Sequence, residues 1–243
     1  MCGLDSCLSS HLEIESESEE RKTYMNNQPK AKCIFCGSEG NITREHAISK
    51  NLFPDNYSKG VLITLPSCKD CNESYSRDEE LFRLFLVNQS TERSRVAMDM
   101  LHGKITRAMK KAPGKAINVL KKMSPVKFKN PDGGLENKVA FYVSAEDWKG
   151  HHRVLDKYVK ALFYKHMGVA IPAHHQITHV FVSDPSKIPN DVKAALRWNL
   201  DHEHIYVYAF ACVPSTLQST WTFVFYDTVI FQSFTAAPGD LTN

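Results

Sequence analysis

Apolar residues recur with two different periods along this chain, and the change of period divides it into parts. The stretch LFRLFLVNQSTERSRVAMDML at 81–101 places Phe82 and Phe85 at helical spacing, so it predicts a helix. Two short amphipathic helices are expected beyond it, at 104–111 and 115–123, because Pro113-Gly114 interrupts the pattern between them.

Residues 135–243 combine strand-like alternation with one long helical stripe. Apolar side chains between 154 and 163 share one helix face that ends at Gly168, and a second helix is predicted at 188–200. The strand candidates are KVAFYVS, THVFVS, HIYVYAFACV and WTFVFYDTVIFQSF, the last folding as a hairpin about 226–228. These elements predict an α+β domain with a mostly antiparallel sheet, separated from the preceding part by the turn NPDGG at 130–134.

The first 30 residues form a polar, acidic stretch that predicts a flexible leader. They contain neither a basic n-region nor a continuous apolar core, so they do not match a secretory signal. No apolar run approaches the roughly 20 residues of a membrane span. We therefore expect a cytoplasmic protein without a membrane partner, in which the seven cysteines serve as metal ligands or free thiols.

Two Cys-x-x-Cys pairs have the number and local spacing of ligands for one structural ion. Cys33 and Cys36 form the first pair, and Cys68 and Cys71 form the second. Four thiolates arranged in this way predict a tetrahedral Zn²⁺ site, and Gly37 supplies the turn that such a knuckle needs. The 31 residues between the pairs exceed a compact ribbon, so a further element is inserted there.

The inserted segment contains Glu45-His46, and Asn72 follows the second cysteine pair directly. The dipeptide is either surface charge or a metal ligand beside a general base. The order Cys-x-x-Cys, acid-His, Cys-x-x-Cys-Asn resembles the His-Asn-His (ββα-metal) endonucleases, and in particular their zinc-framed, endonuclease VII-like branch. The resemblance covers about residues 33–86.

This resemblance implies a treble-clef-like ββα-metal module over residues 31–90. His46 would be the general base that activates water, while Glu45 and Asn72 would hold one Mg²⁺ or Mn²⁺. A helix starting near Cys71 would bring Glu79 to the face of Asn72, where it is either a further metal group or a surface carboxylate. The last His or Asn of the family is not found after Asn72.

Positive charge is concentrated in the segment that follows. The net charge of the chain is only +3, but residues 103–131 hold nine Lys or Arg and no acid. We expect a basic, helical segment over 91–130 that contacts phosphates of double-stranded DNA, since no aromatic residue precedes Phe128. The candidate contacts are Lys104, Arg107, Lys110, Lys111, Lys115, Lys121 and Lys122; Arg44 could bind phosphate or be surface charge.

Three functions remain open at this point. The first is a metal-dependent endonuclease acting on DNA, as a homodimer if both strands are cut. The second is a zinc-stabilised nucleic-acid-binding module without catalysis, and the third is a zinc interaction domain. The histidines at 151–152, 174–175 and 202–204 are interpreted as surface or turn positions, because they lack cysteine partners at ligand spacing.

Overall fold

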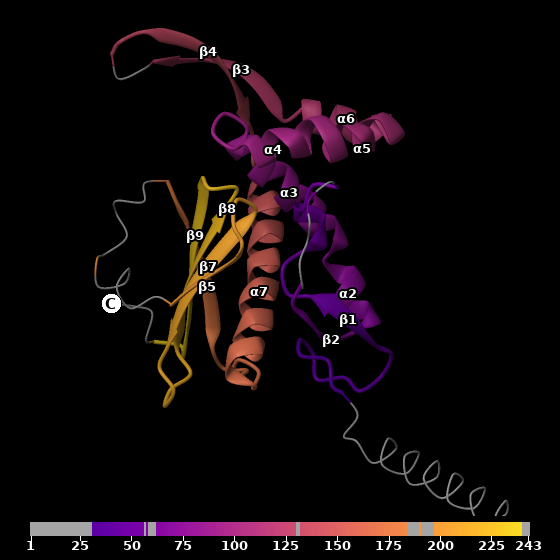
Figure 1. Ribbon diagram of the computed structural model, residues 1–243, viewed down its shortest axis with the longest axis vertical. Coiled ribbons are helices and arrows are strands. Elements are labelled where there is room, and N and C mark those ends of the chain that lie inside the picture. The colour runs from indigo at the N-terminus through magenta and orange to yellow at the C-terminus, as the bar shows by residue number, and fades with distance from the viewer. Residues whose placement is uncertain are drawn as a thin grey trace, which may run out of the picture.

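The computed structural model describes residues 31–55, 57, 62–129, 132–183, 190 and 197–239. The leader expected at 1–30 lies outside this range. The described chain is an α+β structure in layers: α7 (Ala145–Met167) lies between a five-stranded sheet and an N-terminal hairpin with its own helices (Figure 1).

The N-terminal layer is a hairpin followed by helices. Strand β1 (Ile42–His46) pairs antiparallel with β2 (Thr64–Cys68), and the connection contains a short 3-10 helix, η1 (Lys50–Leu52). Strand β2 runs directly into α2 (Lys69–Ser74) and then α3 (Ser76–Ser90). The helix predicted at 81–101 is confirmed through Phe82 and Phe85, which are both buried, as far as Ser90. Its continuation is interrupted at 91–94, and a separate helix begins at Arg95.

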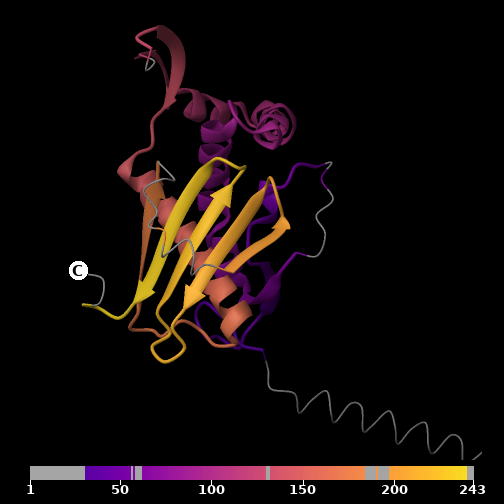
Figure 2. The same cartoon turned by 60° about the vertical axis from the view of Figure 1, so that its left-hand side comes forward.

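The middle of the chain is helical and then extended. Helix α4 (Arg95–Met100) continues through a π-helical turn, η2 (Leu101–Ile105), into α5 (Thr106–Lys111), and α6 (Pro113–Leu120) follows with a proline in its first turn. Strands β3 (Met123–Lys129) and β4 (Leu135–Phe141) then pair as an antiparallel ribbon that stands away from the other layers (Figures 1 and 2).

The prediction that this segment is helical as far as residue 130 is wrong. Helix α6 ends at Leu120, and β3 begins at Met123. Residues Val126 and Phe128 alternate with lysines, which is the period of a strand, and the run of lysines concealed that alternation. The turn expected as a domain boundary at 130–134 connects the two strands of the ribbon.

Helix α7 begins and ends where local chemistry requires it. The Ser144 side chain accepts a hydrogen bond from the Asp147 backbone N–H, and the Asp147 side chain accepts one in return, which completes a capping box. At the other end, Gly168 adopts the left-handed conformation (φ 72°), as the sequence predicts. The apolar stripe between 154 and 163 is buried, so this prediction is confirmed.

The C-terminal sheet is entirely antiparallel, in the order β5-β9-β8-β7-β6, and α7 covers one of its faces (Figure 2). The strands are β5 (Gln176–Val182), β6 (Arg197–His202), β7 (Tyr206–Cys212), β8 (Ser219–Phe225) and β9 (Val229–Ala236). The predicted hairpin is confirmed: Tyr226 and Asp227 both have positive φ, as a two-residue turn that matches the strand twist requires.

The helix predicted at 188–200 falls mostly outside the described residues. Its last part is extended, because β6 starts at Arg197 and pairs with β7. Apolar Trp198 and Leu200 alternate with polar Asn199 along that strand. So short an alternation cannot be distinguished from a helical pattern in the sequence.

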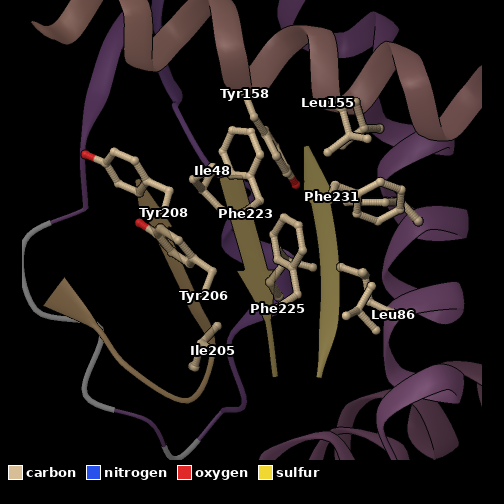
Figure 3. Packing of buried hydrophobic residues seen from close by; sticks show 14 of the residues in the cluster. Ile48, Leu86, Leu155, Tyr158, Ile205, Tyr206, Tyr208, Phe223, Phe225 and Phe231 are labelled. Carbon is tan, nitrogen blue, oxygen red and sulfur yellow. The ribbon is translucent and has the colours of Figure 1, made fainter. Parts of the chain in front are cut away.

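One hydrophobic core unites the layers (Figure 3). Ile48 and Leu86 come from the N-terminal layer, Tyr158 comes from α7, and Phe223 and Phe231 come from the sheet. All are buried in one cluster, so the N-terminal part and the sheet share the apolar contacts that stabilise them.

Candidate metal centre and acid-histidine site

Four cysteines converge at the start of the N-terminal layer. Cys33 and Cys36 precede β1, Cys68 ends β2, and Cys71 lies in the first turn of α2. Their sulfur atoms all lie within 4.8 Å of one another, and they are the only such group of metal-ligating side chains in the described part of the chain. These four thiols could hold a structural metal ion.

The sulfur spacing agrees with a tetrahedral site. Metal–sulfur bonds of about 2.3 Å place ligand pairs roughly 3.8 Å apart in a tetrahedron. The Sγ atoms of Cys36 and Cys68 are 3.7 Å apart. Although burial opposes ionisation, backbone N–H groups of Cys68, Cys36 and Phe35 lower the pKa of the Cys33 thiol to about 6. Burial and the neighbouring thiols raise the pKa of Cys71, and, although the Ser38 backbone opposes this, the Cys33 and Cys68 thiols raise the pKa of Cys36. A thiolate is the form that binds metal.

Local backbone contacts position the first knuckle against the hairpin. Gly37 has φ +76°, a conformation that side chains rarely adopt, and its N–H donates to the Cys33 carbonyl. The Ile34 N–H donates to the Pro66 carbonyl on β2 at 3.1 Å. The first knuckle therefore lies beside β2, the strand that leads through the second cysteine pair into α2.

Strand β1 presents its residues alternately to two sides. Glu45 is buried and only 9% exposed, whereas Arg44 is exposed and His46 is half-buried. Thr43 and Glu45 share one side of the strand, and Arg44 and His46 share the other. The acid and the histidine are therefore separated by the pleat of β1, as the sequence predicts.

The carboxylate of Glu45 pairs with Lys157 of α7, which the sequence analysis did not identify. The Lys157 Nζ donates to Glu45 and also to Glu79 Oε1 at 2.5 Å, and the lysine side chain is fully buried. The ammonium also lies 5.5 Å from the centre of the Tyr75 ring. Two carboxylates from β1 and α3 thus converge on a single cation supplied by the C-terminal half of the chain.

Burial dominates the electrostatics of the acid-His pair. It raises the pKa of the Glu45 carboxyl despite the nearby Lys157 ammonium. It lowers the pKa of His46, and the positive charges of Lys50 and Lys157 lower it further. The Nδ1 atom of His46 is buried and has no hydrogen-bond partner in the described part of the chain. The imidazole is therefore neutral and able to accept a proton near neutral pH.

Asn72 lies beside the same strand. Its Nδ2 donates to the Thr43 Oγ1 at 3.2 Å, and Thr43 in turn donates to the Ser67 carbonyl at 3.0 Å. Because Thr43 and Glu45 share one side of β1, α2 and α3 bring Asn72 and Glu79 to the side of the hairpin that carries Glu45. The sequence-based grouping of Glu79 with Asn72 is thus compatible with the contacts.

The sequence does contain one indication that Lys157 has a buried partner, namely its position inside the apolar stripe of α7. It lies between Val154 and Tyr158 on α7, both fully buried, and a lysine at such a position requires a buried partner. That partner, Glu45, lies 112 residues earlier, so the sequence indicates the need for an acid without identifying it.

Some of the residues predicted to contact phosphates already bind other residues of the chain, whereas others are exposed. Lys104 donates to the Phe53 carbonyl at 3.2 Å, Arg107 pairs with Asp55, and Lys122 pairs with Asp147 at 2.5 Å. The exposed residues without an ion pair to the described chain are Arg44, Lys110, Lys111 and Lys121; the side chain of Lys115 lies outside the description. The free positive charge is thus smaller than the sequence predicts.

The histidine interpretation needs one correction. His151 is buried among Phe82, Phe85 and Trp148, and His202 is buried against Phe53. These are core positions, not surface or turn positions.

No protein-family model, curated protein or solved structure matches this chain. Within the described residues, no helix is both long enough and apolar enough to cross a membrane.

Proposed function

We propose that this chain is a metal-dependent endonuclease of the His-Asn-His (ββα-metal) class, which hydrolyses phosphodiester bonds of double-stranded DNA. The observation that supports this most is the common frame of the residues: four clustered cysteines tie together the hairpin that carries Glu45-His46 and the helix that carries Asn72. This connectivity of knuckle, hairpin and helix supports the expected treble-clef-like module.

The ion in the frame is Zn²⁺ under this proposal. Four thiolates at tetrahedral spacing favour Zn²⁺ over Mg²⁺ or Ca²⁺, which prefer oxygen ligands. Its role is structural, since all four ligand positions are occupied by protein side chains and none is open to a substrate.

His46 acts as the general base. Its lowered pKa keeps the ring neutral, so it can take a proton from water as the water oxygen forms a bond to phosphorus. The bond from phosphorus to the departing 3′ oxygen then breaks. Arg44 shares the side of β1 that carries His46 and is exposed, so it is suited to hold the phosphate.

Glu45 and Asn72, with Glu79 beside them, would hold the catalytic Mg²⁺ or Mn²⁺. The Lys157 ammonium supports a cation site here, because the carboxylates of Glu45 and Glu79 already converge on its one positive charge. A divalent ion would take the place of that charge. Such an ion would neutralise charge on the phosphoryl oxygens and on the departing oxygen. Glu45 must release Lys157 before its carboxylate can serve as an ion ligand.

The same ion pair favours a second candidate, a zinc-stabilised nucleic-acid-binding module without catalysis. In that case Lys157 is a permanent partner of Glu45 and Glu79, and no divalent ion enters. The exposed Arg44, Lys110, Lys111 and Lys121 would then bind phosphates without cleavage.

Cleavage of supercoiled plasmid with and without Mg²⁺ or Mn²⁺ tests the two candidates. We expect the wild type to nick DNA only with the ion, and His46→Ala to lose at least about 100-fold of the rate, as expected for a general base. His102→Ala is the matched control, because His102 is exposed on η2 away from the hairpin. Zinc content of each variant shows that the cysteine frame is intact.

Equal nicking by wild type and His46→Ala would reject His46 as the base. Salt-sensitive DNA binding without cleavage would leave the binding module as the function. Because one chain carries one acid-His site, cutting both strands in one encounter requires two copies. Sedimentation of the DNA complex would therefore detect a homodimer if both strands are cut together.

A further inference from the structure

The ribbon of β3 and β4 is the most exposed regular element of the described chain. Every residue of β3 from Ser124 to Lys129 is exposed, and only the first residue is half-buried. The ribbon extends beyond the helices at its base in both views (Figures 1 and 2). A two-stranded ribbon that projects in this way has two faces available for contact.

The strand register separates the two faces by charge. Pro125 pairs with Val139, Lys127 with Asn137, and Lys129 with Leu135. Since paired residues lie on the same face, these six residues form the outer part of one face, which we call the basic face; Met123 and Phe141 lie on the same side at its base. The basic face holds two lysines, one amide and no acid, and its other three residues are apolar, with Leu135 69% and Val139 57% exposed.

The opposite face is already engaged by internal contacts. Lys138 pairs with Glu92 at 3.2 Å and with Glu136 at 3.8 Å, and its ammonium lies 5.1 Å from the Phe128 ring centre. The positive charge on that face is therefore neutralised, and the Lys138 ammonium lies over the ring of Phe128, which remains 49% exposed. Lys127 and Lys129 have no ion pair to another described residue, so the basic face presents free charge.

We propose that the basic face of this ribbon enters the major groove of double-stranded DNA. The major groove, about 12 Å wide, admits a two-stranded β-ribbon. Lys127 and Lys129 would contact phosphates or guanine edges, and Asn137, opposite Lys127 on β4, could donate to and accept from one adenine edge. The proposal rests on the proposed function only in taking DNA as the ligand, and it concerns binding, not cleavage.

Charge and ring placement favour duplex DNA over other occupants. A second copy of the ribbon would bring its own lysines against Lys127 and Lys129, and like charges placed opposite each other are destabilising. A single strand requires aromatic rings for stacking beside the phosphate contacts, but the six residues of the basic face include none, and the half-exposed ring of Phe128 lies on the opposite face.

The test measures binding of a short fluorescent DNA duplex by the full-length protein and by a variant with Lys127→Gln and Lys129→Gln. Loss of two phosphate contacts should weaken binding about tenfold or more at 0.1 M salt, and it should reduce the salt slope by about 1.8. The matched control carries Lys149→Gln and Lys165→Gln, two exposed lysines on α7, and should bind like the wild type.

Competition with groove-binding dyes and drugs shows which groove of the DNA the protein occupies. Methyl green, which occupies the major groove, should displace the protein, whereas netropsin in the minor groove should not. Unchanged affinity of the ribbon variant, displacement by netropsin alone, absence of duplex binding, or equal binding of single strands would overturn the proposal. A wild-type dimer in sedimentation that dissociates in the ribbon variant would assign the face to a second copy.

Failure of this proposal and failure of the nuclease proposal give different results. Nicking that persists unchanged in the ribbon variant retains the nuclease and rejects the ribbon. Duplex binding that the ribbon variant loses, without any nicking by the wild type, retains the ribbon and rejects the nuclease.

Discussion

Lys157 is the residue on which the chemistry of the acid-His site depends. An ammonium removed from water is stabilised only where its charge is compensated, and here Glu45 and Glu79 supply that compensation. The cysteines, Glu45, His46 and Asn72 could be located from sequence, because motif spacing identifies residues that lie close along the chain. Lys157 could not, because its contact with Glu45 depends on how α7 packs on the N-terminal layer.

Replacing Lys157 tests whether the carboxylates can accept another cation. Without added divalent ion, Lys157→Met should destabilise the fold by about 3–5 kcal/mol, because Glu45 and Glu79 lose the ammonium that lies between them. Millimolar Mn²⁺ should restore part of that loss in the variant and change the wild type little. Denaturant unfolding with and without Mn²⁺ measures both effects, with Lys160→Met as the control on the same helix.

If the Lys157→Met variant is as unstable with Mn²⁺ as it is without added ion, Glu45 and Glu79 are not a site for a divalent ion. The binding module would then be the better account of the chain.

His151 should make stability depend on pH. Burial lowers its pKa from the usual 6.5 to about 4; Asp147 opposes this shift, while His152 and Lys122 add to it. Because the folded chain binds this proton less readily, His151 contributes stability that is complete above pH 6.5 and decreases as the pH falls toward 4. A shift of this size corresponds to about 3 kcal/mol.

His151→Phe should lose this part of the acid sensitivity, since an aromatic ring can pack against Phe82, Phe85 and Trp148 without charging. Unfolding midpoints in denaturant at pH 7 and pH 4.5 measure the effect, with exposed His102→Asn as the control. A fall between the two pH values as large as that of the wild type would show that His151 does not titrate in this range.

At the scale of elements, the sequence predicts best where local signals are complete. Helix α7 has a long apolar stripe, an N-terminal capping box and a C-terminal glycine, and it forms where expected. The β8–β9 hairpin consists of two apolar runs that flank one turn, and its prediction is also confirmed. Strand β3 was missed because its lysines continue the basic run of the preceding helices, although they alternate with Val126 and Phe128 at the period of a strand.

At the scale of the whole molecule, one core should make the metal frame and the sheet unfold together. Phe82 on α3 contacts the rings of Tyr158 on α7 and of Phe225 and Phe231 in the sheet. A change in the cysteine frame that loosens α2 and α3 therefore removes contacts from the C-terminal sheet as well.

Metal removal tests this coupling. Cys36→Ser should lower the zinc content and reduce the free energy of unfolding of the whole chain by several kcal/mol, because binding to a site that exists only when folded stabilises the fold. The control is Cys212→Ser on β7, outside the cysteine cluster. Circular dichroism and the fluorescence of buried Trp221 should report one shared transition.

Separate transitions for the two signals in Cys36→Ser would show that the sheet folds independently of the metal frame. A Cys212→Ser variant as unstable as Cys36→Ser would assign the loss to the sheet and not to the metal.

The pairing of Glu45 with Lys157 also has a consequence for synthesis on the ribosome. Translation proceeds from the N-terminus, so Glu45 and Glu79 leave the exit tunnel well before α7 is complete. During that interval the two carboxylates have no lysine between them, and any cation they hold comes from the surrounding solution. The arrival of α7 therefore brings the compensating ammonium to both carboxylates only late in synthesis.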